Sequence, residues 1–259
     1  MSKIKIAIAT HKSYQMPKED IYFPIQSGAV LNSTDLGYKK DNVGEHISNK
    51  NLNYSELTAV YWLWKNTVAE YKGLTHYRRH FSKNESVSLF STGKFEDVLD
   101  KEKLEALLRE ADIVLPKKRK YYIETIESHY NHTHYEEDLK VTRIVMEKLF
   151  PEYISSYDLV LSKRSAHMFN MFIMKDSLFN DYCEWLFTIL FEVEEMLDIS
   201  EYTPFHQRVF GRISEILLDV WIIKNNHKYV EAPVMFMEKQ DWTNKIQKFI
   251  KSKLFKSKY

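Results

Sequence analysis

The sequence predicts an α/β fold in which helices cover both faces of a mostly parallel central sheet. Short runs rich in β-branched residues alternate with longer segments of helical periodicity along the chain, which is typical of strands joined by helices. No internal repeat, low-complexity segment or linker interrupts this alternation. We therefore expect one domain over residues 1–240, followed by a short tail over residues 241–259.

Five segments have the composition of strands. The expected strands are residues 3–10, 71–77, 112–116, 168–175 and 228–238. The first, "KIKIAIAT", is a compact β-branched run and is typical of a buried strand. The third is expected to stop at Pro116.

Five longer segments have apolar residues at helical spacing. The expected helices are residues 53–68, 100–111, 135–153, 176–197 and 205–226. Asn53 or Ser55 is the expected cap of the first helix. The third is expected to end at Pro151, and Asp176 is the expected cap of the fourth.

Composition and missing motifs exclude several functions. The formal net charge of the 259 residues is +1, so the chain as a whole carries no basic signature of nucleic-acid binding. Cys183 is the single cysteine, which excludes an internal disulfide and a cysteine-based zinc site, and its apolar surroundings predict a core residue. The sequence has no G-x-G-x-x-G motif, Walker loop, G-x-S-x-G elbow or D-x-D triplet.

The two ends of the chain bear on localisation. The first residues lack the pattern of a signal peptide, and no apolar stretch approaches the roughly 18 residues of a membrane span. We therefore expect a cytoplasmic protein. In the lysine-rich tail, Ile246, Phe249, Ile250 and Leu254 share one helical face. This basic amphipathic pattern fits either peripheral association with the inner face of the cytoplasmic membrane or a solubilising terminus.

The densest cluster of cations follows the second expected strand, in "GLTHYRRHF". Open α/β sheets bind ligands beyond the carboxyl ends of their strands, and "THK" at residues 10–12 ends the first strand in the same way. Arg78 and Arg79 have the fork geometry that binds phosphate oxygens, and His11 or Lys12 could add donors. His76 or Tyr77 could stack on a base or sugar. The alternative is a surface strand end with structural arginines.

Three further segments contain candidate site residues. The loop "DNVGEHIS" places Asp41, Asn42 and Gly44 before the first helix, where they could hydrogen-bond a nucleoside or simply form a turn. Arg208, Arg212 and Glu215 lie at helical spacings, which suit either intrahelical ion pairs or a site.

The third segment, residues 124–139, holds three histidines and five carboxylates. His132 and His134 alternate, as on one face of an extended strand. Together with carboxylates they could bind a divalent metal or form an acid–base pair. The alternative is a polar loop that leads into a helix whose acidic first turn favours the helix dipole.

Several blocks along the chain resemble one bacterial family. They include Y-x-E-L-T-x-x-Y-W-x-W-K-N from Tyr54, "GLTHYRRHF", "HYNHTHYEEDL" and "RVFGRISEILLDVWI", and the resemblance spans residues 3–237. The family is described as a domain of unknown function and is associated with capsular and exopolysaccharide biosynthesis. Its members look like glycosyltransferases, and some are similar to galactofuranosyltransferases.

The resemblance implies a GT-A-like fold and a nucleotide-sugar donor such as UDP-galactofuranose. The acceptor would be a lipid-linked or oligosaccharide precursor of a capsular polysaccharide, an exopolysaccharide or an O-antigen. Where GT-A enzymes hold a metal with D-x-D, this sequence has "HYRR", so we expect Arg78 and Arg79, with His76, to neutralise the diphosphate. A divalent metal, Mg²⁺ or Mn²⁺, stays an alternative through His134 and Asp138.

The same resemblance assigns roles to the remaining candidates. The expected base is Asp138, with Glu124 and Glu215 as further candidates. The expected donor-binding residues are Thr10, His11, Lys12, Asp41, Asn42, Gly44, His76, Tyr77, Arg78 and Arg79. The expected acceptor-binding residues are His129, His134, Asn170 and Arg208.

Two rival functions follow from the residues alone. A metal-dependent hydrolase would use the histidine-rich segment 129–138. A nucleic-acid-binding module would place the "HYRRH" cations on phosphates, but the near-neutral net charge counts against it, so we expect no nucleic-acid partner.

Overall fold

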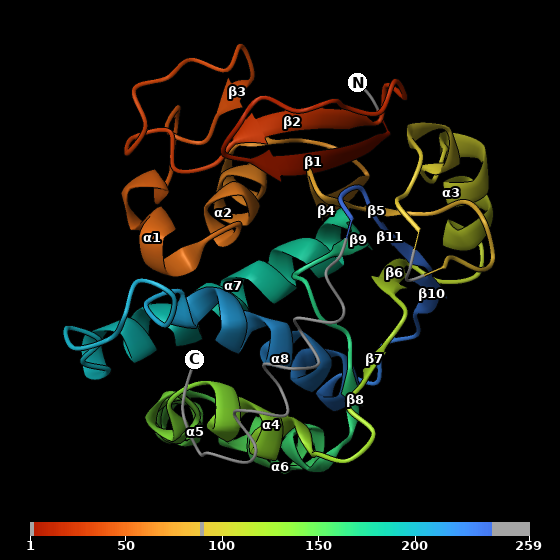
Figure 1. Ribbon diagram of the computed structural model, residues 1–259. Helices are drawn as coiled ribbons and strands as arrows, with labels where there is room; N and C mark the ends of the chain where they lie inside the picture. Colours follow the sequence, from red (N-terminus) through yellow and green to blue (C-terminus); the bar gives the residue numbers. More distant parts are fainter. Residues whose placement is uncertain (1–2, 89–90, 240–259) are drawn as a thin grey trace.

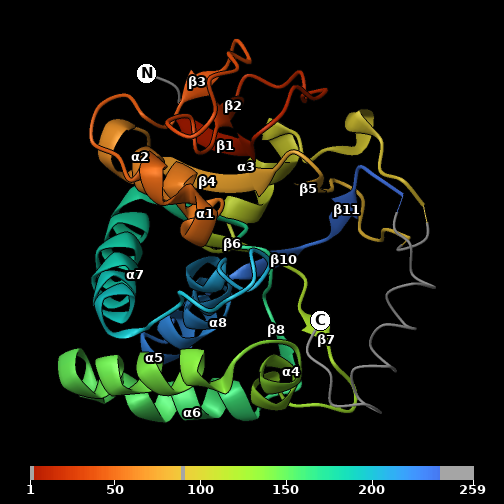
Figure 2. The same cartoon turned by 60° about the vertical axis from the view of Figure 1, so that its left-hand side comes forward.

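A computed structural model describes residues 3–88 and 91–239, and a nine-stranded mixed sheet lies at its centre (Figure 1). The main path of the sheet runs through β3 (Lys39–Lys40), β2 (Tyr22–Gln26), β1 (Ile4–Thr10), β4 (Tyr71–His76), β9 (Phe172–Lys175), β6 (Ile113–Pro116) and β10 (Val230–Ala232). Beside it, β5 (Arg79–Phe81) pairs with β4 and with β11 (Val234–Phe236), which lies alongside β5 in Figure 2.

Most of the main path is parallel, as the sequence predicts. β1 is parallel to β2 and β4, β2 is parallel to β3, and β10 is parallel to β6. β9 is the exception, because it runs antiparallel to both β4 and β6. Gly73 of β4 lies tightly against β9, where an added Cβ would stand 2.7 Å from the Phe172 carbonyl oxygen.

Each face of the sheet has its own apolar core. In β1, Ile6 and Ile8 belong to one core and Ala7 and Ala9 to the other, because successive strand residues point to opposite faces. The alanine side carries the larger core, and helix α3 (Lys101–Leu108) packs on the isoleucine side through Leu104. Helices therefore cover both faces, unequally.

The larger core is built from the remaining helices. They are α1 (Asn51–Tyr54), α2 (Leu57–Asn66), α4 (Ile126–Thr133), α5 (Glu136–Leu149), α6 (Ile154–Ser162), α7 (Asp176–Met196) and α8 (Val209–Lys224). In Figures 1 and 2, α4, α5 and α6 form an outer layer beyond α7 and α8. Cys183 is fully buried in α7, as predicted.

Four local predictions are corrected by the structure. The helix predicted over 53–68 is two helices, α1 and α2, interrupted at Ser55, whose φ of 52° is incompatible with a continuing helix. Ser55 is the C-cap of α1 and Asn53 lies inside α1, so neither is the N-terminal cap that the sequence predicts. The strand predicted over 228–238 is divided into β10 and β11 at Pro233, which has no N–H for a ladder hydrogen bond. Asp176 caps no helix, because its carboxylate pairs with buried Lys72 at 2.7 Å.

The fourth correction concerns the histidine-rich segment. It is not extended, since α4 runs to Thr133, and its N-terminus is capped by the Thr125 hydroxyl, which accepts from the Ser128 N–H. His132 and His134 therefore do not share a strand face: the first binds Glu124 and the second lies beside Arg212.

None of the helices in the described residues is long and apolar enough to cross a membrane. The predicted amphipathic tail over 241–259, and with it the boundary at residue 240, falls outside the described residues.

Candidate active site

A cavity of about 600 Å³ lies beyond the carboxyl ends of β1 and β4. We call it the first cavity. Its walls come from those strand ends, the loop after β2, the break between α1 and α2, and the first turns of α8. The ionisable residues that line it are His11, His76, Arg78, Arg79, Arg208, Arg212, Glu56 and Glu215. Cations outnumber carboxylates here, so the cavity suits an anionic ligand.

The register of the sheet explains how two distant cationic segments meet. Ala9 of β1 pairs with His76 of β4, so the residues after both strands emerge side by side. His76 then pairs with Arg79 across a hairpin whose turn is Tyr77 and Arg78. The predicted shared crevice at the ends of the first two expected strands is therefore confirmed.

Arg79 is held by aromatic rings and not by an acid. Its guanidinium carbon lies 4.6 Å from the ring centre of Phe169 and 5.7 Å from that of Phe236. Within residues 3–88 and 91–239, no hydrogen bond or ion pair engages this guanidinium, and its Nε is buried. Burial lowers its pKa, while Glu215 and Glu56 act in the opposite direction. Because arginine stays charged in proteins, the buried Nε is a donor without a partner among the described residues, on a side chain that lines the first cavity.

Both histidines of the first cavity have lowered pKa values. Burial, together with the neighbouring Arg79 and Arg78, lowers the pKa of His76 to about 2. Its Nδ1 accepts a hydrogen bond of 3.2 Å from the backbone N–H of Arg78, which leaves the proton on Nε2. Burial and Arg78 also lower the pKa of His11. The expectation that His76 helps to neutralise a diphosphate as a cation is therefore corrected: it can only donate a hydrogen bond.

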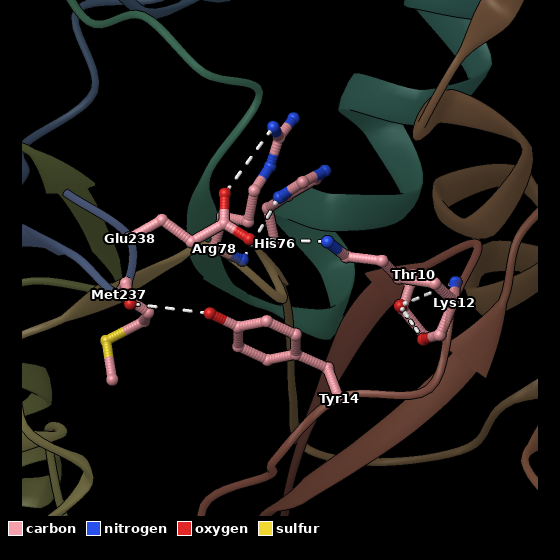
Figure 3. A network of polar contacts seen from close by, with 7 residues as sticks. All are labelled: Thr10, Lys12, Tyr14, His76, Arg78, Met237 and Glu238. Carbon is pink, nitrogen blue, oxygen red and sulfur yellow. Dashed lines mark hydrogen bonds and ion pairs between the residues drawn. The ribbon is translucent and has the colours of Figure 1, made fainter. Parts of the chain in front are cut away.

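Glu238 connects the cations at the edge of the first cavity (Figure 3). Its carboxylate lies 3.3 Å from Lys12 Nζ and 3.8 Å from Arg78 Nη1. The segment that carries it is fixed by two contacts: the Met237 N–H donates to the Arg78 carbonyl, and the Tyr14 hydroxyl donates to the Met237 carbonyl. Lys12 therefore faces Glu238 and does not line the cavity.

The remaining donor candidates have structural positions. Tyr77 is 1% exposed and packs edge-on against His11, so it cannot stack on a ligand base. Thr10 lines the cavity, and its hydroxyl donates to the Lys12 carbonyl, which shapes the turn after β1.

The 41–48 loop lies behind the cavity. Asp41 is fully buried and accepts from the N–H groups of Gly28 and Ala29 and from the Ser48 hydroxyl. Asn42 and Gly44 line neither this cavity nor the next one. The loop does not contact the cavity itself. Asp41 instead fixes the turn next to Ser27, and Ser27 lines the first cavity.

A second cavity of about 420 Å³ adjoins the first, and the two share Arg79, Arg212 and Glu215. We call it the second cavity. Its other lining residues are Arg119, Tyr121, Ile126, His129, Tyr130, Thr133, His134, Met168, Phe169, Phe205 and Ile216. It is thus richer in aromatic side chains than the first. Of the expected acceptor residues, His129 and His134 lie here, whereas Arg208 lines the first cavity.

Glu215 of α8 lies in the wall common to both cavities. Burial and the nearby Glu56 raise its pKa to about 7, although Arg79, the Phe169 N–H and Arg119 favour its ionised form. A carboxyl group with a pKa near neutrality can accept a proton at one step and release it at the next.

Asn170 holds Glu56, the other acid that lines the first cavity, in place. It is 2% exposed, and its amide donates to the Glu56 carboxylate and to the Gly211 carbonyl, each at 2.8 Å. Phe169 and Asn170 both have positive φ, at 84° and 50°. Backbone strain of this kind is kept only where surrounding contacts fix it, as here between α1–α2 and α8. Asn170 lines neither cavity, so the structure makes it a positioning residue.

Asp138 and Glu124 are enclosed by their own partners. Asp138 is 2% exposed and accepts from the hydroxyls of Tyr130 and Tyr202 at 2.8 and 2.7 Å. Burial opposes the ionisation of Glu124, but hydrogen bonds from His129 and His132 outweigh it and lower its pKa. Neither carboxylate lines a cavity. The geometry therefore favours Glu215 over Asp138, the first candidate from sequence, as the base.

The segment 129–138 does not have the arrangement of a metal site. Burial and Arg212 lower the pKa of His134 to about 2, and its Nδ1 lies 3.2 Å from Arg212 Nη1. Across the described ranges, no three His, Cys, Asp or Glu side chains are grouped as metal ligands would be. The residues present thus do not fit the His134–Asp138 metal alternative.

Sequence reasoning missed several residues that line the cavities, chiefly Ser27, Glu56, Arg119 and Tyr121. A signal for Glu56 exists, since it belongs to the block that starts at Tyr54, but the apolar residues of that block predict a continuous buried helix. Arg119 and Tyr121 follow β6 in an ordinary polar stretch and carry no motif.

Comparison with known proteins gives a family and a fold. The profile of a family described as "Domain of unknown function (DUF4422)" matches residues 5–226. Among solved structures, the chain is similar to the apo structure of the bifunctional glycosyltransferase WbbM, with 30% identity and a TM-score of 0.84. The match covers 92% of this chain and 46% of that one, so the chain spans about half the length of that protein. No curated protein matches the chain. The likeness confirms the α/β fold and is consistent with the expected GT-A-like arrangement.

Proposed function

The chain belongs to the DUF4422 family, and we propose that it is a glycosyltransferase that moves a hexosyl group from a nucleotide-sugar donor to a carbohydrate acceptor. The observation that carries this proposal is the position of Glu215, a carboxyl group with a pKa of about 7, in the wall between a cationic cavity and an aromatic one. A transferase must bring its donor and its acceptor together beside one proton acceptor, and Glu215 lies between two cavities that could each hold one of them.

The first cavity is the proposed donor site. Arg78, Arg79 and Arg208 would bind the diphosphate oxygens and stabilise the charge that develops on the leaving group. The neutral His76 would add a hydrogen bond from Nε2. The unpartnered Nε atoms of Arg78 and Arg79 support this role, since buried donors without partners are rare unless a ligand binds them.

The second cavity is the proposed acceptor site. An acceptor hydroxyl placed beside Glu215 would attack the anomeric carbon of the donor sugar from the face opposite the diphosphate. The new C–O bond forms as the bond to the diphosphate breaks, the hydroxyl proton passes to Glu215, and the nucleoside diphosphate leaves with the bonding electrons. This single displacement inverts the anomeric centre.

The finer assignments rest on the sequence resemblance. We propose UDP-galactofuranose as the first donor to test, and a lipid-linked or oligosaccharide precursor of a capsular polysaccharide, an exopolysaccharide or an O-antigen as the acceptor. Association of the 241–259 tail with the inner face of the cytoplasmic membrane would bring the enzyme to a lipid-linked acceptor. No step is assigned to Mg²⁺ or Mn²⁺, because the described residues do not bring a ligand set together.

The first experiment is a thermal-shift titration with nucleotides and nucleotide sugars, with and without EDTA. Ligand at 100 times its Kd raises the free energy of unfolding by about 2.7 kcal/mol, which gives a clear shift. Stabilisation by uridine diphosphate that survives EDTA supports the arginine-lined donor site. The Arg78→Ala, Arg79→Ala double variant should lose it, whereas the matched double variant Arg109→Ala, Arg143→Ala, with both changes on exposed or half-exposed helix positions, should keep it. If no nucleotide or nucleotide sugar stabilises the wild-type protein, the donor site is wrong.

A further inference from the structure

Resting on the proposed function, we infer that the acceptor is an acidic glycan: the second cavity binds a carbohydrate that carries an anionic group, a carboxylate or a phosphate, close to the hydroxyl that reacts. Arg119 is the residue that recognises this group. The inference depends on the charge of the cavity, on which of its cations are already engaged, and on the rings beside the remaining one.

The second cavity is cationic at neutral pH. Three arginines line it, Arg79, Arg119 and Arg212, against a single carboxyl group, Glu215. The two histidines do not change this balance, because burial is the main cause that lowers the pKa of both His129 and His134. A neutral sugar would leave this excess of positive charge without a counterpart.

Two of the three arginines already have other roles. Arg212 donates to His134 Nδ1 and to the Phe205 carbonyl, and its guanidinium lies 4.2 Å from the centre of the Phe205 ring. Arg79 is enclosed by Phe169 and Phe236 and is shared with the proposed donor site.

Arg119 has neither of these roles, because it does not line the proposed donor site and is not hydrogen-bonded as Arg212 is. It is exposed on the short strand β7 (Arg119–Lys120), and the described part of the chain supplies no hydrogen bond or ion pair to its guanidinium. Its guanidinium carbon lies 5.2 Å from the centre of the Tyr121 ring. Arg119 and Glu215 line the same cavity, and the arginine favours the ionised form of Glu215, so an anion bound to Arg119 would lie near the proposed base.

The rings beside Arg119 suit a sugar. Tyr121, Phe169 and Phe205 line the same cavity and offer flat apolar faces to a pyranose or furanose ring. Burial raises the pKa of Tyr121 to about 12, so its hydroxyl stays neutral and can donate to a glycan oxygen. A planar guanidinium next to a ring face is the combination that can bind an acidic sugar through its anion and its ring at once.

The test compares three trisaccharide acceptors of one length: one with glucuronic acid, its neutral glucose counterpart, and a glucose 6-phosphate counterpart. We expect the wild-type protein to prefer both acidic acceptors by about tenfold or more in kcat/KM, since charge-assisted bidentate contacts are the strong ones. Arg119→Gln should raise KM for the acidic acceptors about tenfold and leave the Kd of uridine diphosphate unchanged. Arg109→Gln, an exposed arginine at the end of α3, is the matched control and should behave as wild type.

Titration calorimetry of the same trisaccharides without donor distinguishes this inference from the proposed function. Binding of the acidic trisaccharides that weakens with salt and is lost in Arg119→Gln supports it even if no sugar is transferred. A preference for only one of the two acidic trisaccharides would show whether the anionic group on the acceptor is a carboxylate or a phosphate. Equal binding of the neutral trisaccharide overturns the inference, as does a loss of uridine diphosphate binding in Arg119→Gln, which would assign Arg119 to the donor.

Discussion

Replacing Glu215 by glutamine should make the protein more stable and less active, and the gain in stability should depend on pH. On a scale of about 1.4 kcal/mol for each pKa unit, a pKa raised from 4.5 to about 7 makes the ionised side chain about 3 kcal/mol less favourable in the folded protein than in the unfolded chain. Glutamine keeps the size of the side chain and removes the charge, so Glu215→Gln avoids that loss.

The direction in which the free energy of unfolding changes with pH follows from the number of protons bound to the folded and to the unfolded protein. Between pH 4.5 and about 7, the folded protein keeps a proton on Glu215 that the unfolded chain has released, so the wild-type free energy of unfolding falls as pH rises. At pH 8 we expect Glu215→Gln to be more stable by up to about 3 kcal/mol, or several degrees in Tm, and at pH 5 by about 1 kcal/mol or less.

Urea unfolding at both pH values measures this difference. The control is Glu184→Gln on an exposed face of α7, which should leave the free energy of unfolding unchanged at pH 5 and at pH 8. Glu215→Gln should lose at least about 100-fold in kcat. Wild-type kcat/KM should rise with pH through about 7, as for a base that must be deprotonated. Equal stabilisation at pH 5 and pH 8, or a loss of stability at pH 8, would refute the assignment of a raised pKa to Glu215.

Three further predictions test other parts of the structure. Glu238→Gln should tighten uridine diphosphate binding up to about fivefold in a calorimetric titration, because the carboxylate that competes for Lys12 and Arg78 is removed; weaker binding would mean that Glu238 orients them instead. Asp138→Asn should lower the free energy of unfolding by about 1–3 kcal/mol in urea, since two tyrosine hydroxyls lose a charged acceptor, and a folded variant without activity would instead favour Asp138 as the base. Gly73→Ala should destabilise by about 1–3 kcal/mol, because its Cβ meets the β9 backbone, and an unchanged Tm would contradict the close approach of the strands.

The sequence by itself determined the order of the main elements and the place of the first cavity. The run Ile4–Thr10 is mostly apolar and rich in β-branched residues, and such a composition favours a buried strand wherever the segment lies in the sheet. Parallel neighbours end at the same edge, so the cations after two strands could be predicted to meet before their pairing was known.

Only the tertiary structure decided which side chains line the cavities and in what charge state. Tyr77 and Arg78 are adjacent in sequence, yet one is 1% exposed and the other lines the cavity, because the hairpin turn directs them apart. Asp138 and Glu215 are both carboxylic acids, and burial raises the pKa of each. Two tyrosine hydroxyls enclose the first, whereas the second lines both cavities beside Glu56.

The physical reason is that burial and partners come from segments far apart in the chain. Glu56 is held by Asn170, 114 residues away, and Arg212 meets His134 across 78 residues. A local sequence pattern carries no information about such contacts. These contacts set the pKa values of the side chains and decide which of them line the two cavities.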